Sequence, residues 1–263
     1  MSKKINLIEI DNLEYKNIFK DLSIKISQSS YNILAGASLS GKTTLLKIIG
    51  GLISIDNIKY NDKNYNEINK KEILNNIKYI DINTNINFKE DNIEDIFMKE
   101  LINLDDKSRK YKEIIKISEI IDITNKNINE LTLFERTKLL IGLSLITNPK
   151  LILIDNLCTI TSKSERKEIE KILNDINKTY NASILIATPN LIPVEYADNI
   201  YVINKGEIVL NGKKEDVLKE DNKLNRYGLD LPFIYDLSAK LIDYNLIQNM
   251  IDSQDRMVNA LWK

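Results

Sequence analysis

The sequence predicts an α/β fold in which a mostly parallel sheet is covered by helices on both faces. Three observations predict it: strands that are apolar throughout, helical segments between them, and a glycine-rich loop that joins one strand to a helix. The expected strands are residues 5–10, 22–27, 31–35, 77–82, 151–154, 183–187 and 200–204. With 263 residues, the chain has room for one domain of ordinary size and a small appendage.

The segments around these strands divide the chain into parts. Residues 85–148 carry several helical patterns and few strand signals, so we expect a mainly helical insertion there. The stretch "NKGEIVLNG" predicts a tight hairpin with Gly206 at its turn. We therefore predict one domain over residues 1–212, and a small, mainly helical C-terminal domain over 213–263.

Composition excludes several classes of function. The net charge is −1, from 37 basic and 38 acidic side chains, so no electrostatic attraction to nucleic acid or lipid is expected. The sequence contains no histidine, which rules out histidine metal sites and a histidine general base. Its one cysteine, Cys158, allows no internal disulfide and is interpreted as a small packed residue. Neither a signal peptide nor a run of roughly 20 apolar residues is present.

The glycine-rich loop predicts a phosphate-binding site. "YNILAGASLSGKTTLLKII" carries Gly-x-x-x-x-Gly-Lys-Thr between a strand and a helix, the context that this motif requires. The expected contacts to ATP come from Gly36, Ala37, Ser38, Leu39, Ser40, Gly41, Lys42, Thr43 and Thr44. Lys42 is expected to reach the β- and γ-phosphates, and the Thr43 hydroxyl to ligate Mg²⁺. The alternative is a glycine turn beside a solvent-exposed lysine.

A second segment, "LILIDNLCTITS", places Asp155 at the end of a buried strand. We expect this carboxylate to hold Mg²⁺ together with Thr43. The alternative is a strand-end acid that caps a loop. A protein that cleaves a phosphate bond is expected to carry an acid next, but the following residue is Asn156.

The order of the phosphate loop, the helical insertion, "LTLFE", "LILID" and "LIATPN" resembles an ABC-type ATPase domain over residues 5–212. The tail "RYGLDLPFIYDLSAKLIDYNLI", followed by "RMVNALW", looks like the C-terminal domain of energy-coupling factor (ECF) transporter ATPases. It is closest to the first of their two paired ATPase subunits. The resemblance implies an ABC-type P-loop nucleotide-binding domain with antiparallel N-terminal strands, a mostly parallel core sheet, and bound ATP and Mg²⁺.

The resemblance also implies partners. In the family, two ATPase subunits pair head to tail, and each nucleotide lies between the phosphate loop of one and the signature motif of the other. We expect a second ABC ATPase subunit here, in a heterodimer or alternatively a homodimer. The pair would dock at the cytoplasmic face of the membrane on a scaffold protein that carries a substrate-binding membrane protein. No nucleic acid partner is expected.

Several hydrolysis positions depart from the family pattern. The catalytic glutamate corresponds to Asn156, the switch histidine to Pro189, the Q-loop glutamine to Ile82 and the D-loop aspartate to Ser162. The signature motif, Leu-Ser-Gly-Gly-Gln in the family, corresponds to Leu131, Thr132, Leu133, Phe134 and Glu135. Thr132 could still offer its hydroxyl to a phosphate, whereas Glu135 brings negative charge toward it.

These departures leave three hypotheses. The first is an ATP-binding subunit of an ECF-type importer of a vitamin or metal ion that hydrolyses ATP poorly or not at all at its own site. The second is a structural pseudo-ATPase in the same complex. The third, a soluble ABC protein of translation or DNA repair, is disfavoured by size and charge.

Three further sets of residues are candidates for contacts with ligands or partners. Tyr15 is a candidate to stack on adenine, with packing on the sheet as the alternative. Candidates for contact with a membrane partner are Phe88, Ile93, Ile96 and Phe97. Candidates for a C-terminal dimer contact are Leu231, Pro232, Phe233, Leu261 and Trp262. Ordinary core packing is the alternative for both of these groups.

Overall fold

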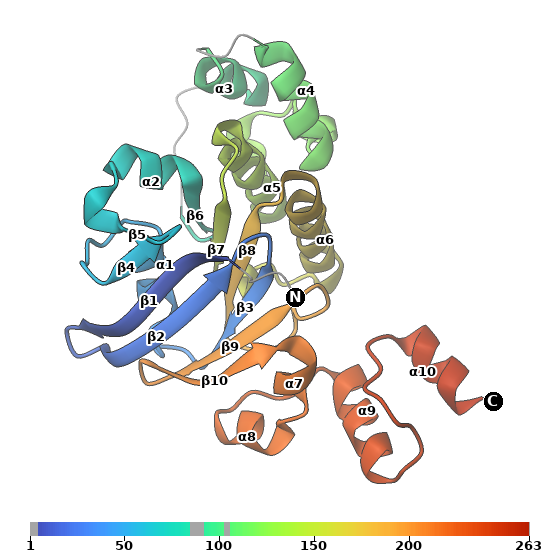
Figure 1. The fold of residues 1–263 in the computed structure, drawn as a ribbon. Coiled ribbons are helices and arrows are strands. Elements are labelled where there is room, and N and C mark those ends of the chain that lie inside the picture. Colours follow the sequence, from blue (N-terminus) through green and yellow to red (C-terminus); the bar gives the residue numbers. More distant parts are fainter. Residues whose placement is uncertain (1–4, 85–91, 103–105, 263) are drawn as a thin grey trace.

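The computed structural model of this chain describes residues 5–84, 92–102 and 106–262, which form two sheets with helices between and around them (Figure 1). The N-terminal sheet is antiparallel, as expected. Its strands, in sheet order, are β2 (Phe19–Ser27), β1 (Asn6–Tyr15), β4 (Ile58–Tyr60) and β5 (Lys63–Asn64). The short strands β4 and β5 were not predicted. A turn of 3₁₀-helix, η1 (Tyr65–Glu67), and α2 (Lys70–Asn76) follow them.

The second sheet carries the predicted parallel core. Its strands, in order, are β10 (Glu207–Lys213), β9 (Asn199–Asn204), β3 (Tyr31–Ala35), β8 (Ser183–Thr188), β7 (Leu151–Asp155) and β6 (Ile77–Asp81). Only β10 runs antiparallel to its neighbour. Gly206, at φ 83°, lies in the tight β9–β10 turn, as predicted. The carboxyl ends of β3, β6, β7 and β8 meet at one edge of the sheet, where open parallel sheets bind their ligands.

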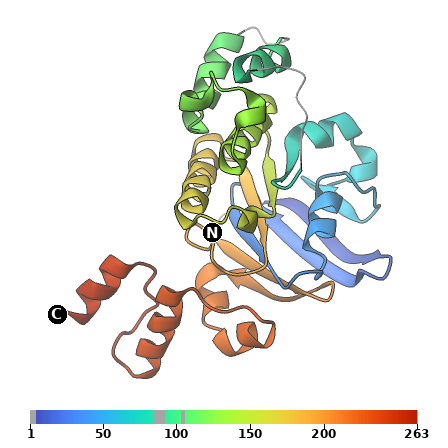
Figure 2. The same cartoon turned by 180° about the vertical axis from the view of Figure 1, so that it is seen from behind.

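Two apolar layers enclose this sheet. On one face α1 (Lys42–Ile49) is packed between the two sheets, and it buries Leu45, Leu46, Ile48 and Ile49. The other face is covered by α5 (Leu133–Ser144) and α6 (Lys163–Tyr180). Figure 2 shows that α5 and α6 lie on the opposite side of the core sheet from the N-terminal sheet. The inner strands β3, β7 and β8 are therefore buried at every residue, which explains why they are mostly apolar, whereas the edge strands β6 and β10 are partly exposed.

The insertion is helical, as predicted. It contains α3 (Ile93–Glu100), α4 (Lys107–Ile117), α5 and the short 3₁₀ segments η2 (Ile121–Ile123), η3 (Ile128–Glu130) and η4 (Leu145–Thr147). Ile93, Ile96 and Phe97 are at most 4% exposed and belong to the main core. These three residues are therefore core residues rather than a contact surface, and Phe88 lies outside the described residues.

The C-terminal segment begins against the sheet and then leaves it. Its helices are α7 (Lys214–Leu218), α8 (Asp221–Arg226), α9 (Phe233–Asp243) and α10 (Gln254–Leu261). The main core includes Val217 of α7, Leu229 after α8 and Tyr235 in the first turn of α9. Beyond this contact, α9 and α10 project away from the body (Figures 1 and 2). The division at 212/213 stays a prediction.

The projecting helices expose much of the proposed dimer contact. The side chains of Phe233 and Trp262 are 72% and 85% exposed, and Leu261 is 43% exposed. Leu231 and Pro232 are half-buried. Among the described residues, no helix has the length and apolar character to cross a bilayer.

Candidate nucleotide-binding site

The phosphate loop connects β3 to α1, and its glycines are required for two different reasons. Gly36 lies so close to β9 that a Cβ atom there would be 2.2 Å from the carbonyl oxygen of Ile203. Gly41 adopts φ 106°, which L-residues with side chains rarely adopt. The intervening residues Ala37, Ser38 and Leu39 are exposed, so the middle of the loop is open to solvent near the N-terminus of α1.

The turn between β1 and β2 borders this loop. A Cβ atom at Gly41 would be 2.7 Å from the ring of Phe19, and Phe19 is paired with Tyr15 across the hairpin. Tyr15 is half-buried against the N-terminal core, and the Lys16 ammonium lies 5.1 Å from its ring centroid. The hairpin therefore holds Tyr15 near the loop, and its role in stacking on adenine stays a prediction.

Lys42 occupies the centre of the loop. Its Nζ donates to the carbonyl oxygens of Gly36 at 2.6 Å and Ala37 at 2.8 Å, and to Ser40 Oγ at 3.4 Å. Burial lowers the pKa of its ammonium, while the nearby Asp155 carboxylate acts in the opposite direction. This cation is therefore partly desolvated, and its hydrogen-bond partners among the described residues are neutral oxygens, so a phosphate would be a stronger partner.

The metal position has the oxygen donors that Mg²⁺ prefers. Asp155 ends β7 and is 2% exposed, and its Oδ2 accepts from the Tyr79 hydroxyl at 3.1 Å. Thr43 lies in the first turn of α1, which contains no acidic residue that would repel a phosphate. A hydroxyl, a carboxylate and phosphate oxygens form a suitable donor set for Mg²⁺, so the residues present fit Mg-ATP.

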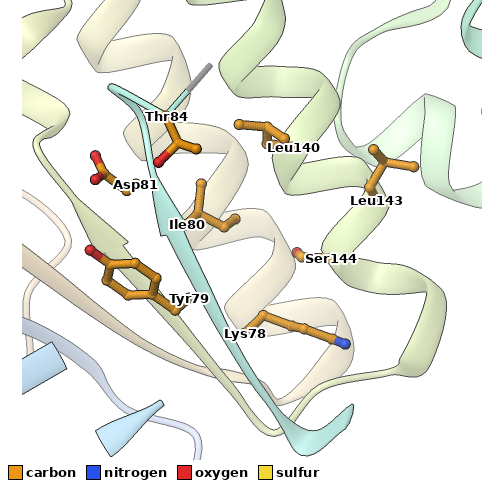
Figure 3. A pocket seen from close by; sticks show the side chains of 8 residues that line it. All are labelled: Lys78, Tyr79, Ile80, Asp81, Thr84, Leu140, Leu143 and Ser144. Carbon is orange, nitrogen blue, oxygen red and sulfur yellow. The ribbon is translucent and has the colours of Figure 1, made fainter. Parts of the chain in front are cut away.

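Two residues that sequence reasoning did not find complete this region. Tyr79 and Asp81 lie on β6, and Figure 3 shows them on the side of the strand away from α5. Burial, and next the Asp155 carboxylate, raise the pKa of Tyr79, so its hydroxyl stays a donor. Asp81 accepts a hydrogen bond from the Asn156 side chain at 2.9 Å. Residues two apart in a strand lie on the same face, so the spacing of Tyr79 and Asp81 in the predicted strand was the signal that could have placed them together.

The remaining departures from the family pattern have local structural roles. Ile82 is 1% exposed and packs in the core beneath the helical insertion. Ser162 is the N-cap of α6, where its Oγ accepts from the Glu165 backbone N–H at 3.4 Å. Pro189 follows β8 directly and is half-buried. Neither Pro189 nor Ile82 has a side chain that can hydrogen-bond water or phosphate.

The signature-equivalent segment forms the start of α5. Thr132 is the N-cap, and a reciprocal capping box joins it to Glu135 at 3.0 and 3.2 Å. Lys126 also donates to Glu135 at 2.6 Å, and this hydrogen bond lowers the pKa of the carboxyl. The negative charge expected at Glu135 is thus compensated within the chain. Leu131 and Phe134 are half-buried against the main core, and Leu133 is 38% exposed.

A small hollow lies behind the loop that follows Asp155. It holds about 90 Å³ and is lined in part by Cys158, Arg166, Glu170, Thr188 and Asn190. Glu170 is 3% exposed, and burial, with the nearby Glu195 acting next, raises its pKa to about 7. The hollow therefore contains a carboxyl group that titrates near neutral pH.

The chain matches the ABC transporter family over residues 19–159, which is more than half of its length. It is 26% identical to an energy-coupling factor transporter ATP-binding protein (EcfA) of Malacoplasma penetrans, over 97% of this chain and 93% of that relative. It is 25% identical to the corresponding protein EcfA1 of Ligilactobacillus salivarius, over 97% of this chain and 95% of that one. The resemblance to ECF transporter ATPases is thus confirmed.

Solved structures agree on the fold. CbiO1 of Clostridium perfringens, described as part of an ABC transporter complex, superposes with a TM-score of 0.76 over 85% of this chain and 96% of that one, at 19% identity. An ATP-binding cassette solved as a dimer with ADP and phosphate superposes with a TM-score of 0.63 over 80% of this chain and 97% of that one, at 18% identity. At these identities the likeness shows the fold alone.

Proposed function

Because this chain belongs to the ABC transporter family, we propose that it is the ATP-binding subunit of an ECF-type importer, in which nucleotide binding closes an ATPase pair and drives uptake of a vitamin or metal ion. The observation that carries the proposal is the complete phosphate loop, with a partly desolvated Lys42 at its centre and the buried Asp155 beside it. Lys42 binds phosphate, and Thr43 and Asp155 hold Mg²⁺.

Hydrolysis at this chain's own site is proposed to be lost or very slow. Asn156 stands where a carboxylate base is needed, and an amide can accept a hydrogen bond from water but cannot take its proton. A positioned general base contributes about 10²–10⁴-fold, and Pro189 and Ile82 remove two further polar groups. ATP would therefore serve to hold the closed state.

The proposed function requires partner subunits. A second ATPase subunit would place its signature motif over this phosphate loop, and the exposed side chains of α9 and α10 would extend the contact. A hollow of about 400 Å³ between β6 and α5, lined by Ile80, Thr84, Leu140 and Leu143 among others, is the surface proposed for the membrane scaffold (Figure 3). The chain would thus act at the cytoplasmic face of the membrane.

The test measures binding and turnover in the same samples. ATP affinity is determined by calorimetry in the presence of Mg²⁺, and phosphate release is followed with the chain alone and with a candidate partner subunit. We expect binding that Lys42→Ala abolishes, with no phosphate release by the chain alone. Release well above the Lys42→Ala background would contradict the proposed loss of hydrolysis. Absence of binding would favour the alternative, a structural scaffold subunit without turnover.

A further inference from the structure

The Asn156 side chain is held by an acid from the neighbouring strand. Its amide Nδ2 donates to Asp81 Oδ1 at 2.9 Å. Strands β6 and β7 run parallel with Asp81 opposite Asp155, so the two carboxylates lie on the same face of the sheet. The acid is itself fixed, because its Oδ1 also accepts from the backbone N–H of Asn83 at 3.0 Å. One hydrogen bond thus joins two strand ends that are 75 residues apart in the sequence.

The Asn156 backbone is equally constrained. It adopts a left-handed conformation with φ 63°, which asparagine tolerates better than most residues. Its N–H donates to Asp155 Oδ1 at 3.0 Å, and its carbonyl oxygen accepts from the Thr159 hydroxyl at 2.8 Å. Within the described part of the chain no donor reaches the side-chain oxygen, Oδ1. This oxygen and the second Nδ2 hydrogen are the polar groups left for a ligand.

We propose that Asp81 is a positioning residue, which fixes the Asn156 amide so that its free groups hold the terminal phosphate of ATP and the water beside it. The inference rests on the proposed function, since it concerns the same nucleotide. It assigns to this pair a preference for ATP over ADP, because ADP lacks the phosphate that the amide would contact.

The chemistry of the pair explains why the acid is needed. An amide at a solvent-facing site can rotate and exchange its oxygen and nitrogen positions, and an unanchored amide would lose this freedom only when nucleotide binds. A hydrogen bond to a carboxylate is stronger than one between neutral groups and fixes which end is the donor. The amide is then oriented before binding, so its contact with the terminal phosphate costs less entropy.

The experiment compares ATP and ADP affinities of the full chain with Mg²⁺, by calorimetry, for Asp81→Ala, Asn156→Ala, the double variant and Asp81→Asn. We expect each alanine variant to lower the ATP-to-ADP preference by about two- to tenfold, the range of one net hydrogen bond. The double variant should lose no more than either single one, because the two residues act as a unit. Asp81→Asn keeps a carbonyl acceptor but loses the charge that fixes the donor end of Asn156, so it should retain more of the preference than Asp81→Ala and less than wild type.

Asp21→Ala is the matched control, because Asp21 accepts from the Asn12 amide at 2.6 Å in a similar pair on the exposed N-terminal sheet. It should leave the preference unchanged. If the alanine variants weaken ATP and ADP binding equally, or if their effects add, the positioning role is wrong while the proposed ATP binding stands. A wild-type chain that binds both nucleotides equally would also overturn the inference, and one that binds neither would overturn the proposed function as well.

Discussion

Replacing Gly36 by alanine tests the geometry of the phosphate loop directly. An added Cβ atom would lie 2.2 Å from the carbonyl oxygen of Ile203, 2.9 Å from the Cγ2 of the same residue, and 2.9 Å from Ser40 Oγ. The nearest atom belongs to the backbone of β9, which is paired with β3 on one side and β10 on the other. It therefore cannot rotate away as a side chain would, and the loop must separate from the sheet.

The expected cost follows from these contacts. Ordinary carbon–oxygen contacts are longer than 3 Å, so the loop and β9 would have to move apart by roughly 1 Å. Overpacking of a close-packed interior costs about 1–3 kcal/mol and occasionally more. Since the nearest clash is with backbone and Gly36 N also donates to Thr188 O at 3.2 Å, we expect about 3 kcal/mol, together with loss of ATP affinity.

Urea unfolding of Gly36→Ala, with ATP affinity measured on the same preparation, gives both quantities. Gly228→Ala is the matched control, because Gly228 has φ 70° but no atom within 4 Å of an added Cβ. It carries only the cost of a left-handed alanine, about 1–2 kcal/mol, and should leave ATP binding intact. A Gly36→Ala variant that is no less stable than Gly228→Ala and still binds ATP would refute the reasoning.

Three further predictions concern other residues. Glu170→Gln should abolish a pH dependence of the free energy of unfolding. Burial raises the Glu170 pKa to about 7 from about 4.5 in the unfolded chain, so the free energy of unfolding falls by about 3 kcal/mol as pH rises through this window. Urea unfolding at pH 5 and 8 should show this loss only in wild type. Thr132→Ala should lower the free energy of unfolding by about 1 kcal/mol through the lost N-cap, whereas Lys126→Ala should lower it less because the Lys126–Glu135 ion pair is half exposed. A larger loss for Lys126→Ala than for Thr132→Ala in urea unfolding would contradict this. Asn156→Glu should not restore fast phosphate release with a partner subunit, because Asp81 faces the new carboxylate and Pro189 remains; an increase of about 100-fold would disprove this.

Sequence reasoning succeeded where the physical signal is local. The inner strands of the core sheet, β3, β7 and β8, are buried on both faces, so their apolar runs are visible without knowing their neighbours. The phosphate loop is likewise contiguous, and its strand and helix were found on either side. Strands β4 and β5 have only three and two residues, too few for a periodic pattern.

The contacts that sequence reasoning missed fall into two kinds. The hydrogen bonds from Asn156 to Asp81 and from Tyr79 to Asp155 span 75 and 76 residues. They depend on which strands become neighbours, and local patterns do not encode this. The role of Glu135 was within reach, because Thr132 followed by a glutamate three residues later is the pattern of a capping box. In the family motif Glu135 lies at a position near phosphate, where its charge would repel, whereas its spacing from Thr132 indicates the N-terminus of a helix.

The polar groups of the phosphate loop differ from those at the departed positions, and this difference favours ATP binding over a purely structural role. At the departed positions, Thr132, Ser162 and Asn156 all form hydrogen bonds that stabilise the chain itself. The phosphate loop differs, because it keeps the Lys42 ammonium partly desolvated and pairs it with the neutral oxygens of Gly36, Ala37 and Ser40. These features cost folding free energy, and an anion would recover it on binding. A scaffold without nucleotide would gain stability from an apolar side chain at position 42, so the loop has the properties of a site that is used.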